Sequence, residues 1–119
     1  MYFLSTIQNE ETKMKKSIVT ETKQEVESKI TEDSFSSDQG IMDWYRIYEK
    51  CKALKMRLPT SDEIGEAHRL GITKTWRPGR YWTNTNSEKN SAMYLDTVDG
   101  YLYGGFKDIL KLRTRCFID

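Results

Sequence analysis

Residues 56–60 read MRLPT, and together with YWTNT at residues 81–85 and RCFI at residues 115–118 they decide the fold of this chain. Pro59 is predicted to end a helix, because the residue before a proline is pushed out of the helical region. Thr60 then begins a second helix, since Glu63 three residues later completes a T-x-x-E capping box. MRLPT therefore predicts a corner between two helices.

Apolar residues on either side of this corner recur at spacings of three and four, as on one face of a helix. The first predicted helix has its apolar stripe at Trp44, Ile47, Tyr48, Cys51 and Leu54. The second has its stripe at Ile64, Ala67 and Leu70, and Gly71 is predicted to cap its C-terminal end.

The chain after Gly71 has the pattern of strands and turns. Residues 76–79 (WRPG) form a turn signal, residues 93–98 a short strand, and Asp99-Gly100 a two-residue hairpin signal that leads into a return strand at residues 101–103. The last strand is predicted to place Leu110, Leu112, Cys116 and Ile118 on one face and Lys111, Arg113 and Arg115 on the other. Two helices followed by a small antiparallel sheet make an α+β domain.

Composition limits this domain to the later part of the 119 residues. Residues 1–40 carry 5 Lys/Arg against 8 Asp/Glu, whereas residues 41–119 carry 14 against 10 and contain all three Trp. The first segment is too polar to bury a core of its own, although Met14, Ile18, Val26 and Ile30 share a weak helical stripe. We therefore predict a flexible charged tether over 1–40 and a folded domain over 41–119.

The R-L-P-T corner, the Y-W-[ST]-x-T segment, the Asp-Gly hairpin and the R-C-φ ending resemble the C-terminal domain family of the Legionella collagen-like protein. The resemblance covers roughly residues 44–118. It implies a C-type-lectin-like fold, distantly similar to the formylglycine-generating enzymes and to the variable proteins of diversity-generating retroelements. Because many different sites occur on this scaffold, the resemblance implies architecture more than ligand.

The resemblance also implies a disulfide between Cys51 and Cys116, since C-type-lectin-like domains join their first helix to their last strand in this way. The alternative is a pair of reduced, buried thiols, which a cytosolic location would favour. For Arg57 and Arg115, which match positions common in the family, the implied role is a structural salt bridge.

Catalytic and metal-binding patterns are weak. His68 is the single histidine and has no nucleophile that the sequence can place beside it. Asp96 and Asp99 flank the hairpin, but the paired loop motif and the W-N-D motif of calcium-dependent lectins are absent. We therefore expect no enzyme activity, no metal and no cofactor.

Cationic and amide side chains supply the candidate ligand-binding site. Arginine forks beside an aromatic ring suit sulfate, phosphate or carboxylate groups on a polymer, and the resemblance implies sulfated glycosaminoglycans as one such class. Asn84 and Asn86 lie in a predicted polar loop over residues 84–91. The candidate residues are Lys74, Trp76, Arg77, Arg80, Asn84, Asn86, Lys111 and Arg113. Solvated charge rows and a plain connecting loop are the alternative interpretations.

Two function classes therefore lead. The first is a non-enzymatic recognition module that binds a glycan or a protein at a cell surface, an anionic polysaccharide being one such ligand. The second is an assembly module whose N-terminal segment associates with a partner. We expect no specific nucleic acid ligand and no transmembrane span. Residues 1–4 (MYFL) lack the regions of a signal peptide, so the expected location is the cell envelope or exterior if a signal segment precedes this chain, and the cytoplasm otherwise.

Overall fold

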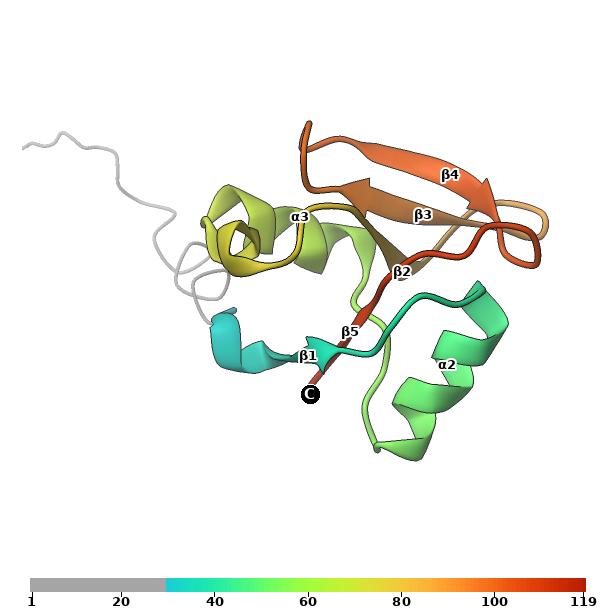
Figure 1. Cartoon of the computed structure of the whole chain (residues 1–119), viewed down its shortest axis with the longest axis horizontal. Helices are drawn as coiled ribbons and strands as arrows, with labels where there is room; N and C mark the ends of the chain where they lie inside the picture. The colour runs from blue at the N-terminus through green and yellow to red at the C-terminus, as the bar shows by residue number, and fades with distance from the viewer. Residues whose placement is uncertain (1–29) are drawn as a thin grey trace, which may run out of the picture.

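A computed structural model describes residues 30–119 (Figure 1). In chain order the elements are η1 (Glu32–Ser34), β1 (Phe35–Asp38), α2 (Trp44–Ala53), α3 (Ser61–Arg69), η2 (Ile72–Thr75), β2 (Arg80–Glu88), β3 (Ser91–Asp96), β4 (Leu102–Phe106) and β5 (Arg115–Phe117). The predicted α+β class is confirmed, with helices and antiparallel sheets in one chain. Residues 1–29 of the tether predicted over 1–40, with Met14, Ile18 and Val26 of its helical stripe, lie outside the described residues. Ile30 of that stripe packs against the core that contains Phe35.

The folded region includes residues 30–40, which the sequence prediction placed in the tether. Phe35 of β1 is opposite Phe117 of β5 in an antiparallel pair, and its buried ring makes edge contacts with Trp76 and Phe117. Local periodicity does not reveal β1, because its sequence is FSSD and its partner strand lies some eighty residues further along the chain. The folded part therefore starts well before residue 41.

Helix α2 buries part of the predicted stripe. Asp43 caps its N-terminal end by accepting a hydrogen bond from the Arg46 N–H, and Trp44, Ile47 and Cys51 are buried. Tyr48 and Leu54 are exposed, contrary to the prediction. Tyr48 stacks on the Trp44 ring, and Leu54 lies beyond the last helical residue.

Helix α3 begins at the predicted capping box. The Thr60 side chain accepts from the Glu63 N–H, and the Glu63 carboxylate accepts from the Thr60 N–H. Ile64 and Ala67 are buried, but Leu70 is exposed at the C-cap. Gly71 follows with a φ of 84°, a left-handed conformation that favours glycine and that turns the chain into η2.

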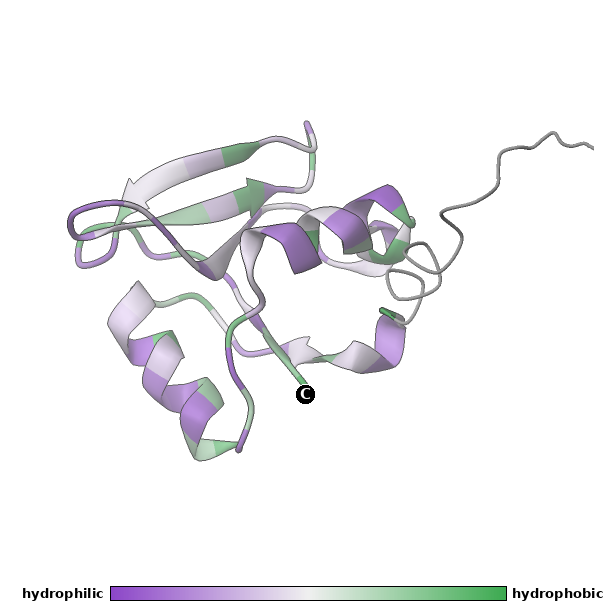
Figure 2. Ribbon diagram, turned by 180° about the vertical axis from the view of Figure 1, so that it is seen from behind, coloured by the Kyte–Doolittle hydropathy of each residue, from purple (hydrophilic) through white to green (hydrophobic). Residues whose placement is uncertain are grey.

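The three-stranded sheet has the order β2-β3-β4, and α2 and α3 lie at different places beside it (Figures 1 and 2). The buried apolar side chains form two clusters, one that contains Trp82 and one that contains Tyr81. Tyr81 and Trp82 are neighbours on β2, so their side chains point to opposite faces. Tyr81 is opposite Leu95 and Trp82 is opposite Tyr94. One core, beside α2, contains Trp44, Ile47, Cys51, Leu58, Trp82, Ala92, Tyr94, Leu112 and Cys116. The other, beside α3, contains Phe35, Ile64, Ala67, Trp76, Tyr81, Leu95 and Phe117.

The strands differ from the predicted ranges at their ends. β3 starts at Ser91 and not at residue 93, and β4 continues to Phe106. Residues 97–100 form the turn between them, with Gly100 at a φ of 81°. The Asp-Gly hairpin signal is therefore confirmed in position.

The predicted disulfide is present: Cys51 of α2 and Cys116 of β5 are bonded, with their Cα atoms 5.5 Å apart. Both residues are fully buried. The predicted long last strand is wrong, since β5 covers only Arg115–Phe117. Phe117 is buried and Ile118 is exposed, because this segment runs between the two cores and each core takes side chains from it.

Candidate functional site

Three of the predicted cationic residues meet at one shallow surface pocket of about 290 Å³. We call it the basic pocket. It is lined by Ile41, Gly79, Arg80, Lys111, Leu112 and Arg113. The pocket thus joins segments that are more than thirty positions apart in the sequence.

Backbone hydrogen bonds hold these segments together. The Arg113 N–H donates to the Arg80 carbonyl at 3.0 Å, and the Trp82 N–H donates to the Arg113 carbonyl at 3.0 Å. On the other side, Met42 and Leu112 exchange N–H to carbonyl bonds of 3.0 Å each, which places Ile41 at the pocket. The backbone positions of the lining residues are therefore fixed by pairing and not by a free loop.

Gly79 lines the pocket with a backbone conformation that favours glycine. Its φ of 154° lies in the region that side chains rarely adopt. Its N–H donates to the Thr97 hydroxyl at 3.0 Å, and the Thr97 hydroxyl donates to its carbonyl at 3.1 Å. A Cβ at this position would lie 3.9 Å from the Arg113 Nε, an ordinary contact distance, so the backbone conformation and not the space favours glycine here.

The three cations of the pocket differ in what neutralises them. Arg113 donates from Nη1 to the Asp38 carboxylate at 3.0 Å, and both side chains are mostly buried. Within residues 30–119, Arg80 and Lys111 make no salt bridge to a carboxylate. The Arg80 guanidinium lies 5.8 Å from the centre of the Tyr94 ring. Two exposed positive charges are therefore available to an anionic ligand, beside a third that is already paired.

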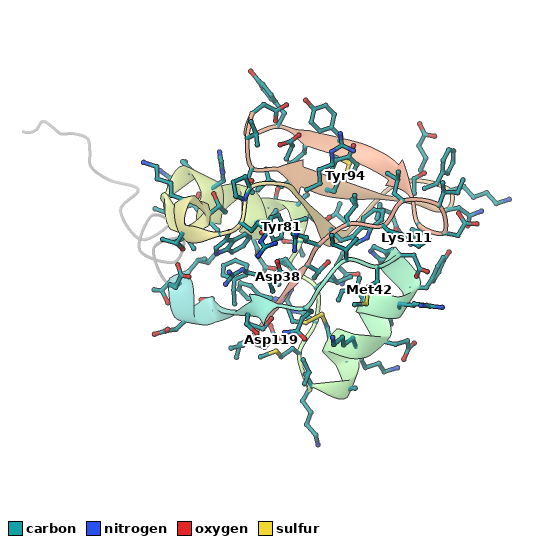
Figure 3. The ribbon with its side chains drawn as sticks, viewed as in Figure 1. Asp38, Met42, Tyr81, Tyr94, Lys111 and Asp119 are labelled. Carbon is teal, nitrogen blue, oxygen red and sulfur yellow. A yellow bond between two sulfur atoms is a disulfide. The ribbon has the colours of Figure 1, made fainter. Side chains whose placement is uncertain are left out.

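Tyr81 follows Arg80 on β2 and is a fully buried structural residue. Figure 3 shows it in the middle of the molecule, with Asp38 on a neighbouring segment. Burial raises the pKa of its hydroxyl, and the nearby Asp38 carboxylate adds to the rise. The hydroxyl donates to the Arg77 carbonyl at 2.6 Å. Because the Tyr81 hydroxyl stays protonated and hydrogen-bonded, its role in this position is structural.

Other predicted site residues lie elsewhere. Trp76 is only 3% exposed, with the Arg115 guanidinium 4.9 Å above its ring, so a ligand cannot stack on it. Lys74 and Arg77 are exposed but do not line the basic pocket. Closeness in sequence to Arg80 therefore does not bring them to the pocket.

Asn84 and Asn86 are exposed on β2 and not in a loop. The strand continues to Glu88, and the turn consists of residues 89–90, with Asn90 at a φ of 63°. Because Arg80 is at the start of β2, the strand carries both asparagines away from the basic pocket. Sequence reasoning missed Ile41, Gly79 and Leu112 as pocket residues, and only the turn glycine gave a local signal.

The MRLPT corner is held by ion pairs. Arg57 donates to both oxygens of Glu63 at 2.8 Å and to the Asp119 carboxylate at 2.9 and 3.1 Å. Burial raises the Glu63 pKa, but hydrogen bonds from Arg57 and from the Thr60 N–H outweigh it, so the net pKa lies below its ordinary value of 4.5. The structural salt bridge implied for Arg57 is thus present. Arg115 instead stacks on Trp76 and donates to the Ser36 carbonyl.

His68 has a structural environment. Its Nδ1 is 2.7 Å from the buried Thr73 hydroxyl, and its ring packs beside Gly100 of the hairpin. In the part of the chain that the structure describes, no group of three or more His, Cys, Asp or Glu side chains is placed to hold a metal ion. None of the helices described is long and apolar enough to span a bilayer.

Comparisons with protein-family models, with curated proteins and with solved structures find no match to this chain.

Proposed function

We propose that this chain is a non-enzymatic recognition module with a C-type-lectin-like fold, and that its basic pocket binds an anionic polymer at a cell surface. The observation that carries the proposal is the convergence of Arg80, Lys111 and Arg113 on one pocket, where Arg80 and Lys111 make no salt bridge to a carboxylate among residues 30–119. A sulfated polysaccharide is the ligand class that fits this arrangement.

Pocket chemistry supports an extended ligand over a small one. The pocket is open and shallow, and Ile41 beside it is largely exposed. Sulfate or carboxylate groups spaced along a polymer can contact Arg80 and Lys111 together, while its sugar rings cover Ile41. Each exposed ion pair contributes at most about 1 kcal/mol, so affinity depends on several contacts along the polymer.

The disulfide supports a location outside the cytosol. Bonds of this kind form and persist in oxidising compartments and are rare in cytosolic proteins. The Cys51–Cys116 bond joins α2 to β5, the same pairing that the resemblance implies for C-type-lectin-like domains. The presence of the bond favours a secreted or envelope protein, and its position favours the C-type-lectin-like fold.

The test is retention on immobilised heparin with two matched double variants. Arg80→Gln/Lys111→Gln removes the unpaired pocket charges, whereas Lys52→Gln/Lys89→Gln removes two exposed charges that do not line the pocket. Losing two surface ion pairs weakens binding by about twofold to thirtyfold, so the pocket variant should elute at lower salt than the control variant.

If the two variants elute at equally reduced salt concentrations, heparin binding depends on net charge and not on the basic pocket. Wild-type protein that fails to bind at low ionic strength would contradict the anionic ligand altogether. Melting temperatures of both variants check that the fold is intact, and soluble dextran sulfate as competitor separates polymer charge from the identity of the sugar.

A further inference from the structure

A second surface pocket, of about 360 Å³, lies beside the turn that joins β2 to β3. We call it the turn pocket. It is lined by Ser87, Glu88, Ser91, Gly104, Gly105 and Phe106, so it has no lining residue in common with the basic pocket. Arg80 begins β2 and Glu88 ends it, which puts the two pockets at opposite ends of this strand. Figure 1 shows the turn at the end of the sheet where β4 finishes.

The turn pocket opens on a sheet face that is packed elsewhere. Ser91 is opposite Phe106, and Leu95 is opposite Leu102. Residues four apart on a strand point to the same face, so these two pairs share one face of the sheet. Leu95 is buried in the core beside α3, whereas Phe106 is 55% exposed. The same face therefore changes from core to open surface along β3 and β4.

Glycine is required at the wall of the turn pocket. A Cβ at Gly104 would lie 2.7 Å from the Ser87 Oγ and 3.1 Å from the Ser87 Cβ. Any larger residue at position 104 would therefore displace Ser87. Without a side chain here, the Ser87 hydroxyl lies directly over the β4 backbone.

The polar side chains of the turn pocket lack protein partners. Ser91 is only 6% exposed, yet its hydroxyl makes no hydrogen bond within residues 30–119, and the same holds for the Ser87 hydroxyl. Glu88 makes no salt bridge in that part of the chain. Buried polar groups are normally hydrogen-bonded. The Ser91 hydroxyl thus indicates that a hydrogen-bonding molecule occupies the pocket.

The lining combines these polar groups with one exposed aromatic ring. A sugar residue matches it, because the C–H face of a pyranose can pack on the Phe106 ring while its hydroxyls donate to the Glu88 carboxylate and bond to the serine hydroxyls. Among the residues that line the pocket, Glu88 is the only charged one. Its carboxylate would repel an acidic sugar.

We propose that the turn pocket binds a single neutral pyranose residue, packed on Phe106 and hydrogen-bonded by Ser87, Glu88 and Ser91. The pocket volume is near the lower end of the range for small-molecule sites, about 300–1,000 Å³, which suits one sugar residue. The proposal does not depend on the anionic ligand, because the two pockets have separate linings and opposite charge.

The test is an NMR titration of the ¹⁵N-labelled full chain with neutral methyl glycosides of the common hexoses and N-acetylhexosamines. High ionic strength suppresses charge-driven binding at the basic pocket. At least one glycoside should shift the amides of residues 87–91 and 104–106. The uronic acid with the same ring as that glycoside should bind more weakly, because it brings a carboxylate next to Glu88.

Variants identify the groups that bind. Phe106→Ala should weaken binding of the glycoside about tenfold, and Phe106→Trp, which keeps a ring, should restore it. Tyr101→Ala is the matched control, because it removes a more exposed ring that does not line the pocket. Glu88→Ala should also weaken binding about tenfold, whereas Glu49→Ala on α2 should leave it unchanged.

The proposal is overturned if no neutral glycoside shifts residues 87–91 and 104–106, since the pocket then holds solvent only. Equal affinity for the matched uronic acid would overturn the neutral ligand class. Equal weakening by Phe106→Ala and Tyr101→Ala would overturn the contact with the pocket ring. If Phe106→Ala lowers the melting temperature strongly, the shifts of the wild-type protein and the Glu88 variant decide. Loss of heparin binding alone would count against the basic pocket and not against this one.

Discussion

Reduction of the Cys51–Cys116 bond should lower the free energy of unfolding by about 4 kcal/mol. The two residues are 65 positions apart, and in the chain-entropy model a loop of that size restricts the unfolded chain by this amount. For a domain of this size such a loss corresponds to a fall of roughly 15–30 °C in melting temperature. Since small domains have only about 5–15 kcal/mol of stability, this loss would remove between about a quarter and about four-fifths of it.

Urea unfolding followed by tryptophan fluorescence, with and without reductant, measures this difference. Cys51→Ala/Cys116→Ala controls for effects of the reductant, and it should be no more stable than the reduced wild type, because both sulfurs are fully buried and their packing is also lost. A reduced protein within about 1 kcal/mol of the oxidised one would refute the entropic reasoning. It would also mean that the two cores hold the fold without the bond.

Two further predictions concern the corner and the hairpin. Because the Glu63 pKa is depressed in the folded state, the carboxylate contributes its full stability above the unfolded pKa of about 4.5 and loses it as the pH falls through the folded pKa. The free energy of unfolding in urea should therefore fall less steeply with decreasing pH for Glu63→Gln than for wild type. An equal pH dependence of the two free energies would contradict this. Gly100→Ala should destabilise the fold by about 1–3 kcal/mol, because Gly100 has a φ of 81° and the new Cβ would lie 2.8 Å from the His68 ring nitrogen. Gly65→Ala, with open space around it on α3, should stabilise the fold by about 0.5–1 kcal/mol. Equal melting temperatures for the two variants would show that neither the backbone strain nor the close contact at Gly100 matters.

Local patterns predicted the helices well. The Thr60–Glu63 capping box and the buried positions Trp44, Ile47 and Cys51 are as expected, because capping and helical periodicity depend on residues a few positions apart. The stripe failed at Tyr48 and Leu54. Hydrophobic periodicity predicts which side of a helix is buried. It does not predict how much of the helix circumference the core covers or where the helix ends.

Pairing between segments far apart in the chain could not be predicted from the sequence. Residues 30–40 join the fold through the contact of Phe35 with Phe117, which no local pattern in FSSD predicts. The last strand failed for a related reason. In a strand with one buried face, buried and exposed residues alternate. The segment around Thr114 and Phe117 lies between two cores, so it buries both odd-numbered and even-numbered residues.

The candidate site was predicted in part. Arg80, Lys111 and Arg113 line one pocket, although the sequence placed them in two separate groups. Trp76 was a candidate because it is an aromatic residue close to several cations in the sequence, but its ring packs between Phe35 and Tyr81. Residue type alone does not distinguish an aromatic ring of the core from one that contacts a ligand.

The most direct test of the central claim is an NMR titration of the ¹⁵N-labelled full chain with a short sulfated heparin oligosaccharide at low salt. The account predicts that amide shifts concentrate at Gly79, Arg80 and residues 111–113, and that they fade as ionic strength approaches the physiological range, where the screening length is about 8 Å. Shifts that centre on Lys52, Lys89 or Asn84, or an unchanged spectrum, would contradict binding at the basic pocket.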